Sequence, residues 1–139
     1  MDNFQTVSGM MIDEMESHAR KLGVKGVALV ASMDKYGHSW LSRMKAVETI
    51  KDIPANPEGH EYPGYNFIGI AYSKAAEMAD TRLNSGSKSR PVYQGEFGYQ
   101  GGVIREVPSG FMLTVFSGAS GEQDLEIANV GMIAYPREE

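Results

Sequence analysis

The chain has 139 residues, 42% hydrophobic and 22% charged, a balance typical of a globular protein rather than a disordered one. This length favours a single domain over residues 1–139, because two half-sized domains would each bury too little surface. The net charge is −5 and the cationic residues are scattered along the sequence, which argues against a nucleic-acid partner. The absence of cysteine excludes thiol nucleophiles, disulfides, thiolate metal sites and iron–sulfur clusters.

The beginning of the chain predicts neither a signal peptide nor a membrane anchor. No basic segment opens it, and Asp13, Glu14 and Glu16 interrupt the methionine-rich stretch that follows. No apolar run approaches the roughly 20 residues that a membrane-spanning helix requires. We therefore expect a cytoplasmic location and no membrane partner.

An amphipathic helix is predicted over residues 6–22, with Thr6 or Ser8 as its N-cap and Gly23 as its left-handed stop. Spacings of four, four, three and four residues place one stripe along its core-facing side. The members of the stripe are Val7, Met11, Met15, His18 and Leu22.

A β-hairpin is predicted next. Residues 27–33 form a short, nearly continuous apolar run, which is typical of a buried strand. The tetrad Asp-Lys-Tyr-Gly at 34–37 is suited to a turn, and residues 38–44 then alternate as a second strand does. The prolines and glycines of residues 51–65 predict an exposed loop.

The second half of the chain predicts two more helices and a second hairpin. Small and apolar residues predict a helix over 67–83, and the polar and glycine-rich stretch 85–101 predicts no regular element. Residues 103–107 and 111–116 read as a second hairpin, and residues 122–135 as a final helix ended by Pro136. The order predicts an α+β fold in which an antiparallel sheet is flanked by helices.

Gly95, Gly98 and Gly101 superficially suggest a dinucleotide fingerprint. Such a motif needs a strand before it and a helix after it, and both are missing here. We therefore reject this interpretation. The glycines more simply permit the close approach of a ligand or of another subunit.

Three segments, in this order, resemble a known family. The first is Ala-Arg-Lys-Leu-Gly-Val at 19–24 leading to Asp-Lys-Tyr-Gly-His at 34–38, and the second is Ser-Lys-Ala-Ala at 73–76. The third is Gly-Gly-Val-Ile at 101–104, followed by Phe-Ser-Gly-Ala-Ser-Gly-Glu-Gln-Asp at 116–124 and Ile-Ala at 127–128. Together they are similar to the GlcG/HbpS-like haem-binding family, which also includes the C-terminal domain of PduO-type cobalamin adenosyltransferases.

The resemblance implies a profilin-like fold, a homo-oligomer, and haem or a related tetrapyrrole as the ligand. We assign the ligand site to Lys74, Tyr99, Gly101, Gly102, Ser117 and Gly118, together with His18. The sequence departs from the family pattern at Arg105, where no proline follows the Gly-Gly motif, and in its long loop 51–65.

Haem iron requires an axial nitrogen, oxygen or sulfur donor. The candidates are the three histidines His18, His38 and His60, any of the nine methionines, or a tyrosine such as Tyr99. We favour His18 as the iron ligand because it lies on the apolar stripe of its helix. The alternative is a core or interface histidine that bonds a backbone carbonyl. His38 directly follows a turn and is expected to be exposed.

Two further features admit a functional and a structural interpretation. The loop 117–121 precedes a helix and could offer backbone N–H groups to a propionate, but Ser120 with Gln123 forms a plausible capping box, which we favour. Lys74 and Asp124 could act as general base or acid if buried, although no motif in the sequence brings them together. A solvated lysine and a helix-capping carboxylate are the alternatives.

The leading hypothesis is therefore a non-catalytic binding protein for haem or another tetrapyrrole. The second is a small enzyme or accessory protein of a catabolic pathway that acts on a small organic acid or aldehyde through Lys74 or Asp124. The third is a purely structural subunit of an oligomer.

Overall fold

The computed structural model describes residues 3–48 and 65–136. Three helices and four strands alternate in these ranges as predicted, which confirms the α+β class. In chain order they are α1 (Phe4–Leu22), β1 (Gly26–Asp34), β2 (Trp40–Val47), α2 (Phe67–Thr81), β3 (Gly102–Val107), β4 (Gly110–Ser117) and α3 (Gly121–Ile133). No helix in these ranges has the length and apolarity needed to cross a membrane.

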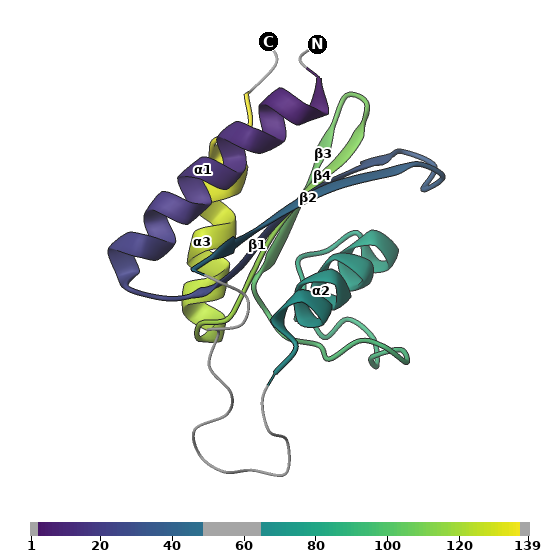
Figure 1. The fold of residues 1–139 in the computed structure, drawn as a ribbon. Helices are drawn as coiled ribbons and strands as arrows, with labels where there is room; N and C mark the ends of the chain where they lie inside the picture. The colour runs from purple at the N-terminus through teal and green to yellow at the C-terminus, as the bar shows by residue number, and fades with distance from the viewer. Residues whose placement is uncertain (1–2, 49–64, 137–139) are drawn as a thin grey trace.

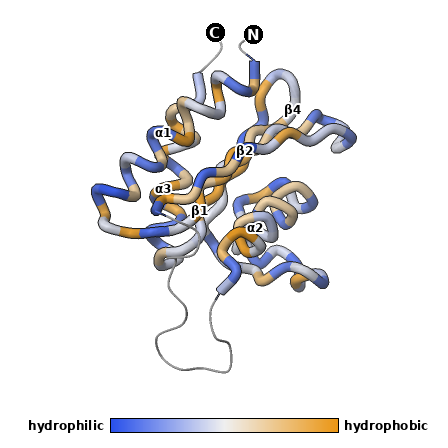
Figure 2. The backbone as a smooth tube through the Cα atoms, viewed as in Figure 1, coloured by the Kyte–Doolittle hydropathy of each residue, from blue (hydrophilic) through white to orange (hydrophobic). Residues whose placement is uncertain are grey.

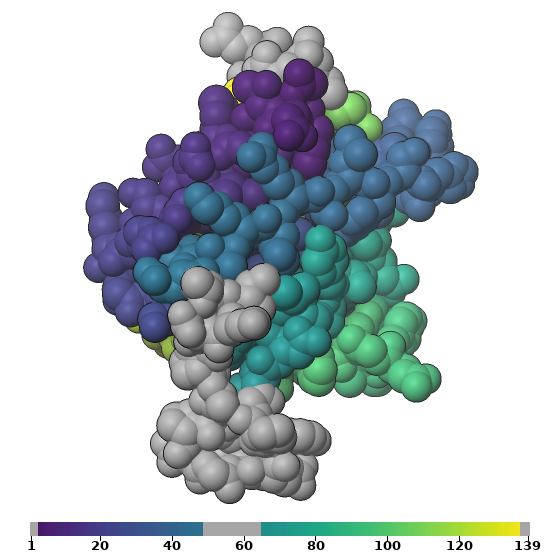
Figure 3. All heavy atoms as spheres, viewed as in Figure 1, coloured from purple at the N-terminus to yellow at the C-terminus, as the bar shows by residue number. Residues whose placement is uncertain are grey.

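The four strands form one antiparallel sheet in the order β2-β1-β4-β3. Helices α1 and α3 cover one face, and α2 covers the other together with residues 85–101 (Figure 1). The tip of the β1–β2 hairpin projects from the body of the molecule (Figure 3). The two hairpins were predicted separately, and the pairing of β1 with β4 joins them into one sheet.

The strand β1 lies inside the sheet and is buried on both faces, which explains its continuous apolar run. Ala28 and Val30 pack toward α1 and α3, whereas Leu29 and Ala31 pack toward α2. The strand β4 alternates in the same way. The tube coloured by hydropathy shows the apolar residues concentrated between the helical layers (Figure 2).

Several predicted element ends shift: α2 ends at Thr81 rather than at residue 83, and α3 ends at Ile133 rather than at residue 135. Two other shifts have local reasons that hydrogen bonds show. Helix α1 begins at Phe4 rather than at residue 6, because Asn3 is its N-cap and accepts a hydrogen bond from the Thr6 N–H. Gly23 ends the helix at a φ of 70°, as predicted. Strand β2 begins only at Trp40, since the Asp34 carboxylate accepts the N–H groups of residues 38 and 39 and prolongs the turn.

Residues 85–101 contain no helix or strand, as predicted, but side chains fix them against α2. Glu77 accepts the Gly86 N–H at 2.8 Å. Arg90 pairs with Asp80 of α2 and, through two bonds, with Glu96 of the segment itself. This irregular segment therefore has a defined position from which it forms one wall of a cavity.

Candidate functional site

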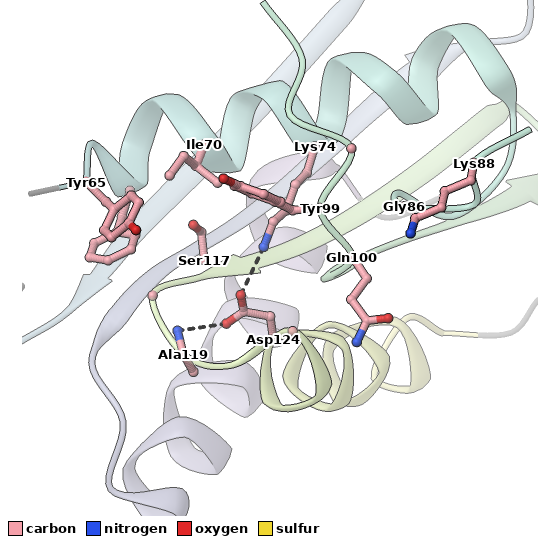
Figure 4. Close-up of a pocket in the computed structure, with 14 residues that line it drawn as sticks. Tyr65, Ile70, Lys74, Gly86, Lys88, Tyr99, Gln100, Ser117, Ala119 and Asp124 are labelled. Atoms are coloured by element: carbon pink, nitrogen blue, oxygen red, sulfur yellow. Dashed lines mark hydrogen bonds and ion pairs between the residues drawn. The ribbon is translucent and has the colours of Figure 1, made fainter. Parts of the chain in front are cut away.

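A cavity of about 630 Å³ lies where β4 ends and α3 begins, between α2 and residues 85–101 (Figure 4). Four parts of the chain contribute to it: the start of α2, the irregular segment, the loop after β4, and the first turn of α3. The lining residues are Tyr65, Phe67, Ile70, Lys74, Gly86, Lys88, Gly98, Tyr99, Gln100, Ser117, Gly118, Ala119, Gly121 and Asp124. Its size is within the roughly 300–1,000 Å³ of small-molecule sites.

Aromatic rings and an aliphatic side chain form the apolar part of the lining. Tyr65 stacks on Phe67 with ring centroids 5.9 Å apart, and Tyr99 stacks on Phe97 at 5.4 Å. Ile70 of α2 lies between the rings of Tyr65 and Tyr99 in the close-up (Figure 4). Tyr99 is half exposed. The cavity therefore offers flat apolar surfaces that solvent can reach.

A buried ion pair forms the base of the cavity. The Lys74 Nζ of α2 donates to the Asp124 Oδ2 of α3 at 3.0 Å and to the Phe116 carbonyl of β4 at 2.8 Å. The other carboxylate oxygen of Asp124 accepts the Ala119 N–H at 2.9 Å. The two side chains are 2% and 6% exposed. One pair thus links α2, β4, α3 and the loop after β4.

Burial moves both pKa values of this pair toward neutrality. Desolvation lowers the pKa of Lys74, and the attraction of Asp124 only partly opposes it. Desolvation likewise raises the pKa of Asp124, against the effect of Lys74 and of the backbone N–H groups. The free-energy difference between the ionised and the neutral pair is therefore smaller than in water.

Gly101 and Gly102 lie behind the lining and provide space for side chains of α2 and α3. At Gly101, whose φ is 127°, a Cβ would come 2.5 Å from Lys74 Nζ and 2.7 Å from Asp124 Cβ. At Gly102 a Cβ would come 2.6 Å from Met78 Cε. Both glycines of the predicted site therefore support the cavity without lining it.

Ser120 and Gln123 form the predicted capping box at the start of α3, so the favoured structural interpretation of this loop is confirmed. Ser117 and Gly118 nevertheless line the cavity together with Lys74 and Tyr99. The structure thus brings together four of the residues assigned to the ligand site. It also unites Lys74 with Asp124, whose proximity no sequence motif revealed.

His18 lies away from the cavity. Its side chain is 26% exposed and pairs with Glu126 of α3, in the layer on the opposite face of the sheet from α2. The expectation that its imidazole faces apolar surroundings is therefore wrong. His38 is exposed, as expected. His60 and most of the loop 51–65 lie outside the described residues.

Sequence reasoning missed most of the aromatic lining and Lys88. A usable signal existed for the ion pair, because Lys74 falls on the same helical face as the buried Ala71 and Met78, where a charge needs a partner. No signal of that kind marks Tyr65, which precedes its helix. In the described ranges no cluster of three or more histidine or acidic side chains could hold a metal ion.

The architecture and the site define an α+β protein with an antiparallel sheet, flanking helices and a small-molecule cavity. No protein-family model and no curated protein matches the sequence. Solved structures do match, at 16–17% identity, which shows a shared fold.

Three of these structures confirm the predicted GlcG/HbpS-like fold. The Klebsiella pneumoniae protein ORFY, of the DUF336 family, is similar at a TM-score of 0.66, with 16% identity over 96% of this chain and 90% of the other. PduOC, solved in complex with heme, is similar at a TM-score of 0.65, with 16% identity over 96% and 94%. A double mutant of Streptomyces reticuli HbpS gives a TM-score of 0.54, with 17% identity over 99% and 89%.

Proposed function

We propose that this protein binds a small organic ligand in the cavity beside Lys74 and Asp124, and that the ligand is haem or a related tetrapyrrole. The observation that carries the proposal is the lining itself, in which stacked aromatic rings and polar side chains border the same cavity. The likeness to PduOC, which was solved with heme, supports the choice of a tetrapyrrole.

The chemistry of the lining fits haem. Tyr65, Phe67 and Ile70 provide apolar contacts for a macrocycle, and Lys88 provides a cation for a propionate. The described lining contains no histidine or methionine, so a phenol oxygen is the available iron donor, and Tyr99 is the residue that we assign to it. Haem bound there would supply electron-transfer or gas-binding chemistry, while the chain positions it and limits the access of water.

An absorbance titration with hemin tests this proposal. We expect a saturable Soret shift at one hemin per chain, and a changed spectrum for Tyr99→Phe. Two controls are matched: Tyr36→Phe alters an exposed tyrosine of the hairpin turn, and His18→Ala alters a histidine outside the cavity. A weak change that does not saturate, or a spectrum altered by His18→Ala but not by Tyr99→Phe, would contradict the assignment.

A second candidate function is acid–base catalysis on a small carbonyl compound. The specific observation in its favour is the contact of Lys74 with Asp124 at the cavity, with the pKa values of both groups shifted toward neutrality. Such a pair can accept and return a proton. Exchange of the methyl protons of pyruvate in D₂O, followed by NMR, would show it. No exchange above that of Lys74→Met would exclude it.

We also propose that the chain forms a homo-oligomer in the cytoplasm. The small residues Ala71 and Ala75 of α2 do not provide the interface, because they are fully buried against the chain's own sheet. Large apolar side chains are exposed elsewhere, around the hairpin and the outer face of α2. They are Tyr36, Trp40, Leu41 and Tyr72.

A further inference from the structure

Ser117 is a buried residue whose hydroxyl lines the cavity and has no hydrogen-bond partner among the described residues. The residue is only 1% exposed, yet it belongs to the lining. Its Oγ makes no hydrogen bond with any of the described residues, in contrast to the buried Ser73, whose hydroxyl donates to the Ile70 carbonyl at 2.7 Å. Among the described residues, Ser85 Oγ is the polar side-chain atom that is fully enclosed without a partner, so the unpartnered Ser117 hydroxyl is reached from the cavity and is available to a ligand.

The position of Ser117 follows from the alternation of β4. Leu113 and Val115 point to the α2 face and pack in its core, and Ser117 continues the same row two residues later. The row therefore changes from apolar to polar at the point where the strand reaches the cavity. Figure 4 shows the hydroxyl pointing toward α2, on the same side as Lys74.

Lys74 supplies a second donor beside this hydroxyl. An ammonium group has three N–H donors, and two of them bond the Phe116 carbonyl and Asp124. One N–H remains without a partner among the described residues, and Lys74 lines the cavity. Two donors without a partner among the described residues thus belong to the lining of the same cavity, where the sole carboxylate of the described lining is already bonded.

The charges favour an anionic acceptor. The titratable groups of the described lining, apart from its tyrosines, are Lys74, Lys88 and Asp124. The charges of Asp124 and Lys74 cancel, so the positive charge of Lys88 is the net charge of these three side chains. Gly121, the first residue of α3, also lines the cavity, and the helix dipole adds a weak positive potential there.

We propose that Ser117 and Lys74 form a subsite that accepts a carboxylate of the ligand through the Ser117 O–H and the free Lys74 N–H. This inference rests on the proposed function, since it names the chemical group that the cavity recognises. The carboxylate can belong to a haem propionate or to a smaller aromatic acid. Both sources present the same pair of acceptor oxygens.

Calorimetric titrations with paired probes test the subsite. Hemin is compared with its dimethyl ester, and benzoate with benzyl alcohol, because each second member lacks the carboxylate. In each pair of probes, we expect the member with a carboxylate to bind more tightly. Ser117→Ala should weaken the binding of that member about ten-fold, which is the effect of losing one hydrogen bond to a charged group. Ser85→Ala is the matched control, because Ser85 is also a buried, unpartnered hydroxyl but does not line the cavity.

A second variant separates the loss of the hydrogen bond from the loss of side-chain packing that Ser117→Ala also causes. Ser117→Cys preserves the size of the side chain but replaces a strong donor with a weak one, so we expect it to weaken binding as well. In this cysteine-free chain the new thiol is also a specific reporter, and bound hemin or benzoate should slow its alkylation by iodoacetamide.

The outcomes separate this proposal from the one on which it rests. If hemin and its ester bind equally and Ser117→Ala has no effect, the subsite is refuted while haem binding survives. If benzoate binds in a Ser117-dependent manner and hemin does not bind, the subsite is supported and the haem proposal is refuted. Equal weakening by Ser117→Ala and Ser85→Ala would also refute the subsite.

Discussion

Gly101 lies directly against the ammonium group of Lys74, so that a Cβ at position 101 would come 2.5 Å from Nζ. The glycine also fixes the end of the irregular segment against β4, because its carbonyl accepts the Phe116 N–H at 3.0 Å. The backbone between residues 85 and 101 thus ends on the ion pair that forms the base of the cavity. The position of this segment and the integrity of the pair are therefore linked.

Gly101→Ala should unfold at lower denaturant concentration than Gly95→Ala. Both glycines have a positive φ, 127° and 93°, so both substitutions carry backbone strain of about 1–3 kcal/mol. A Cβ at Gly95 meets no atom within 4 Å, whereas one at Gly101 displaces Lys74. Chemical denaturation of the two variants measures the difference. Equal losses of stability would show that Gly101 does not support the ion pair.

Removal of one partner of the ion pair should cost more than removal of both charges. Lys74→Met or Asp124→Asn alone leaves a buried charge without its partner, which costs about 3–5 kcal/mol. The asparagine can still accept the Ala119 N–H, so the double variant Lys74→Met/Asp124→Asn loses mainly the charges. A double-mutant cycle by urea denaturation should show strong coupling, and additive effects would contradict it.

The Lys74→Met variant should also become less stable as the pH rises. Burial already raises the pKa of Asp124, and the loss of Lys74 removes the main opposing charge. A carboxyl whose pKa is raised in the folded state stabilises that state at low pH, and this stabilisation is lost as the pH passes its folded pKa. The difference in the free energy of unfolding between the wild type and Lys74→Met should therefore be larger at pH 8 than at pH 5.

The contribution of Glu96, in the wall of the cavity, to the stability of the fold should have the opposite pH dependence. The two hydrogen bonds from Arg90 lower the pKa of Glu96 below its usual value of 4.5. Its contribution to stability is present above that value and is lost as the pH falls through the lowered folded pKa. The Tm difference between wild type and Glu96→Gln should stay constant from pH 7 to 5 and shrink at lower pH. A difference that persists at pH 3 would contradict this role of Glu96.

Size-exclusion chromatography with light scattering tests the homo-oligomer. We expect a mass that is a multiple of 15.2 kDa at micromolar concentration. The double variant Trp40→Ser/Leu41→Ser removes two of the exposed apolar side chains on β2 and should shift the mass toward that of one chain. A monomeric wild type would exclude the oligomer.

The regular elements could be predicted from the sequence because local patterns specify them. The apolar run of β1 and the stripe of α1 each reflect burial that the structure shows. The sheet order could not be predicted, since the pairing of β1 with β4 joins residues more than 70 positions apart. The ion pair depends on the same long-range arrangement, because Lys74 and Asp124 are separated by 50 positions.

That His18 ligates iron stays a prediction, but its premise, an imidazole in apolar surroundings, is wrong for a related reason. Its place on the helical stripe is correct, but α1 also packs against α3, and there Glu126 provides a polar partner. The preference for His18 as iron ligand rested on apolar surroundings that it does not have. Tyr99 could not be ranked from sequence, because no periodic pattern exists in the segment that holds it.

The central claim, that the cavity is the ligand site, is tested most directly by ¹⁵N NMR of the protein titrated with zinc protoporphyrin IX, which is diamagnetic. The claim predicts that the amide signals of Lys74, Tyr99, Ser117, Gly118 and Ala119 shift together and saturate at one ligand per chain. Another surface groove, between α1 and α3 and lined by Met10 and Ile133, should not respond. Shifts confined to that groove or to the surroundings of His18, with the cavity signals unchanged, would contradict the claim.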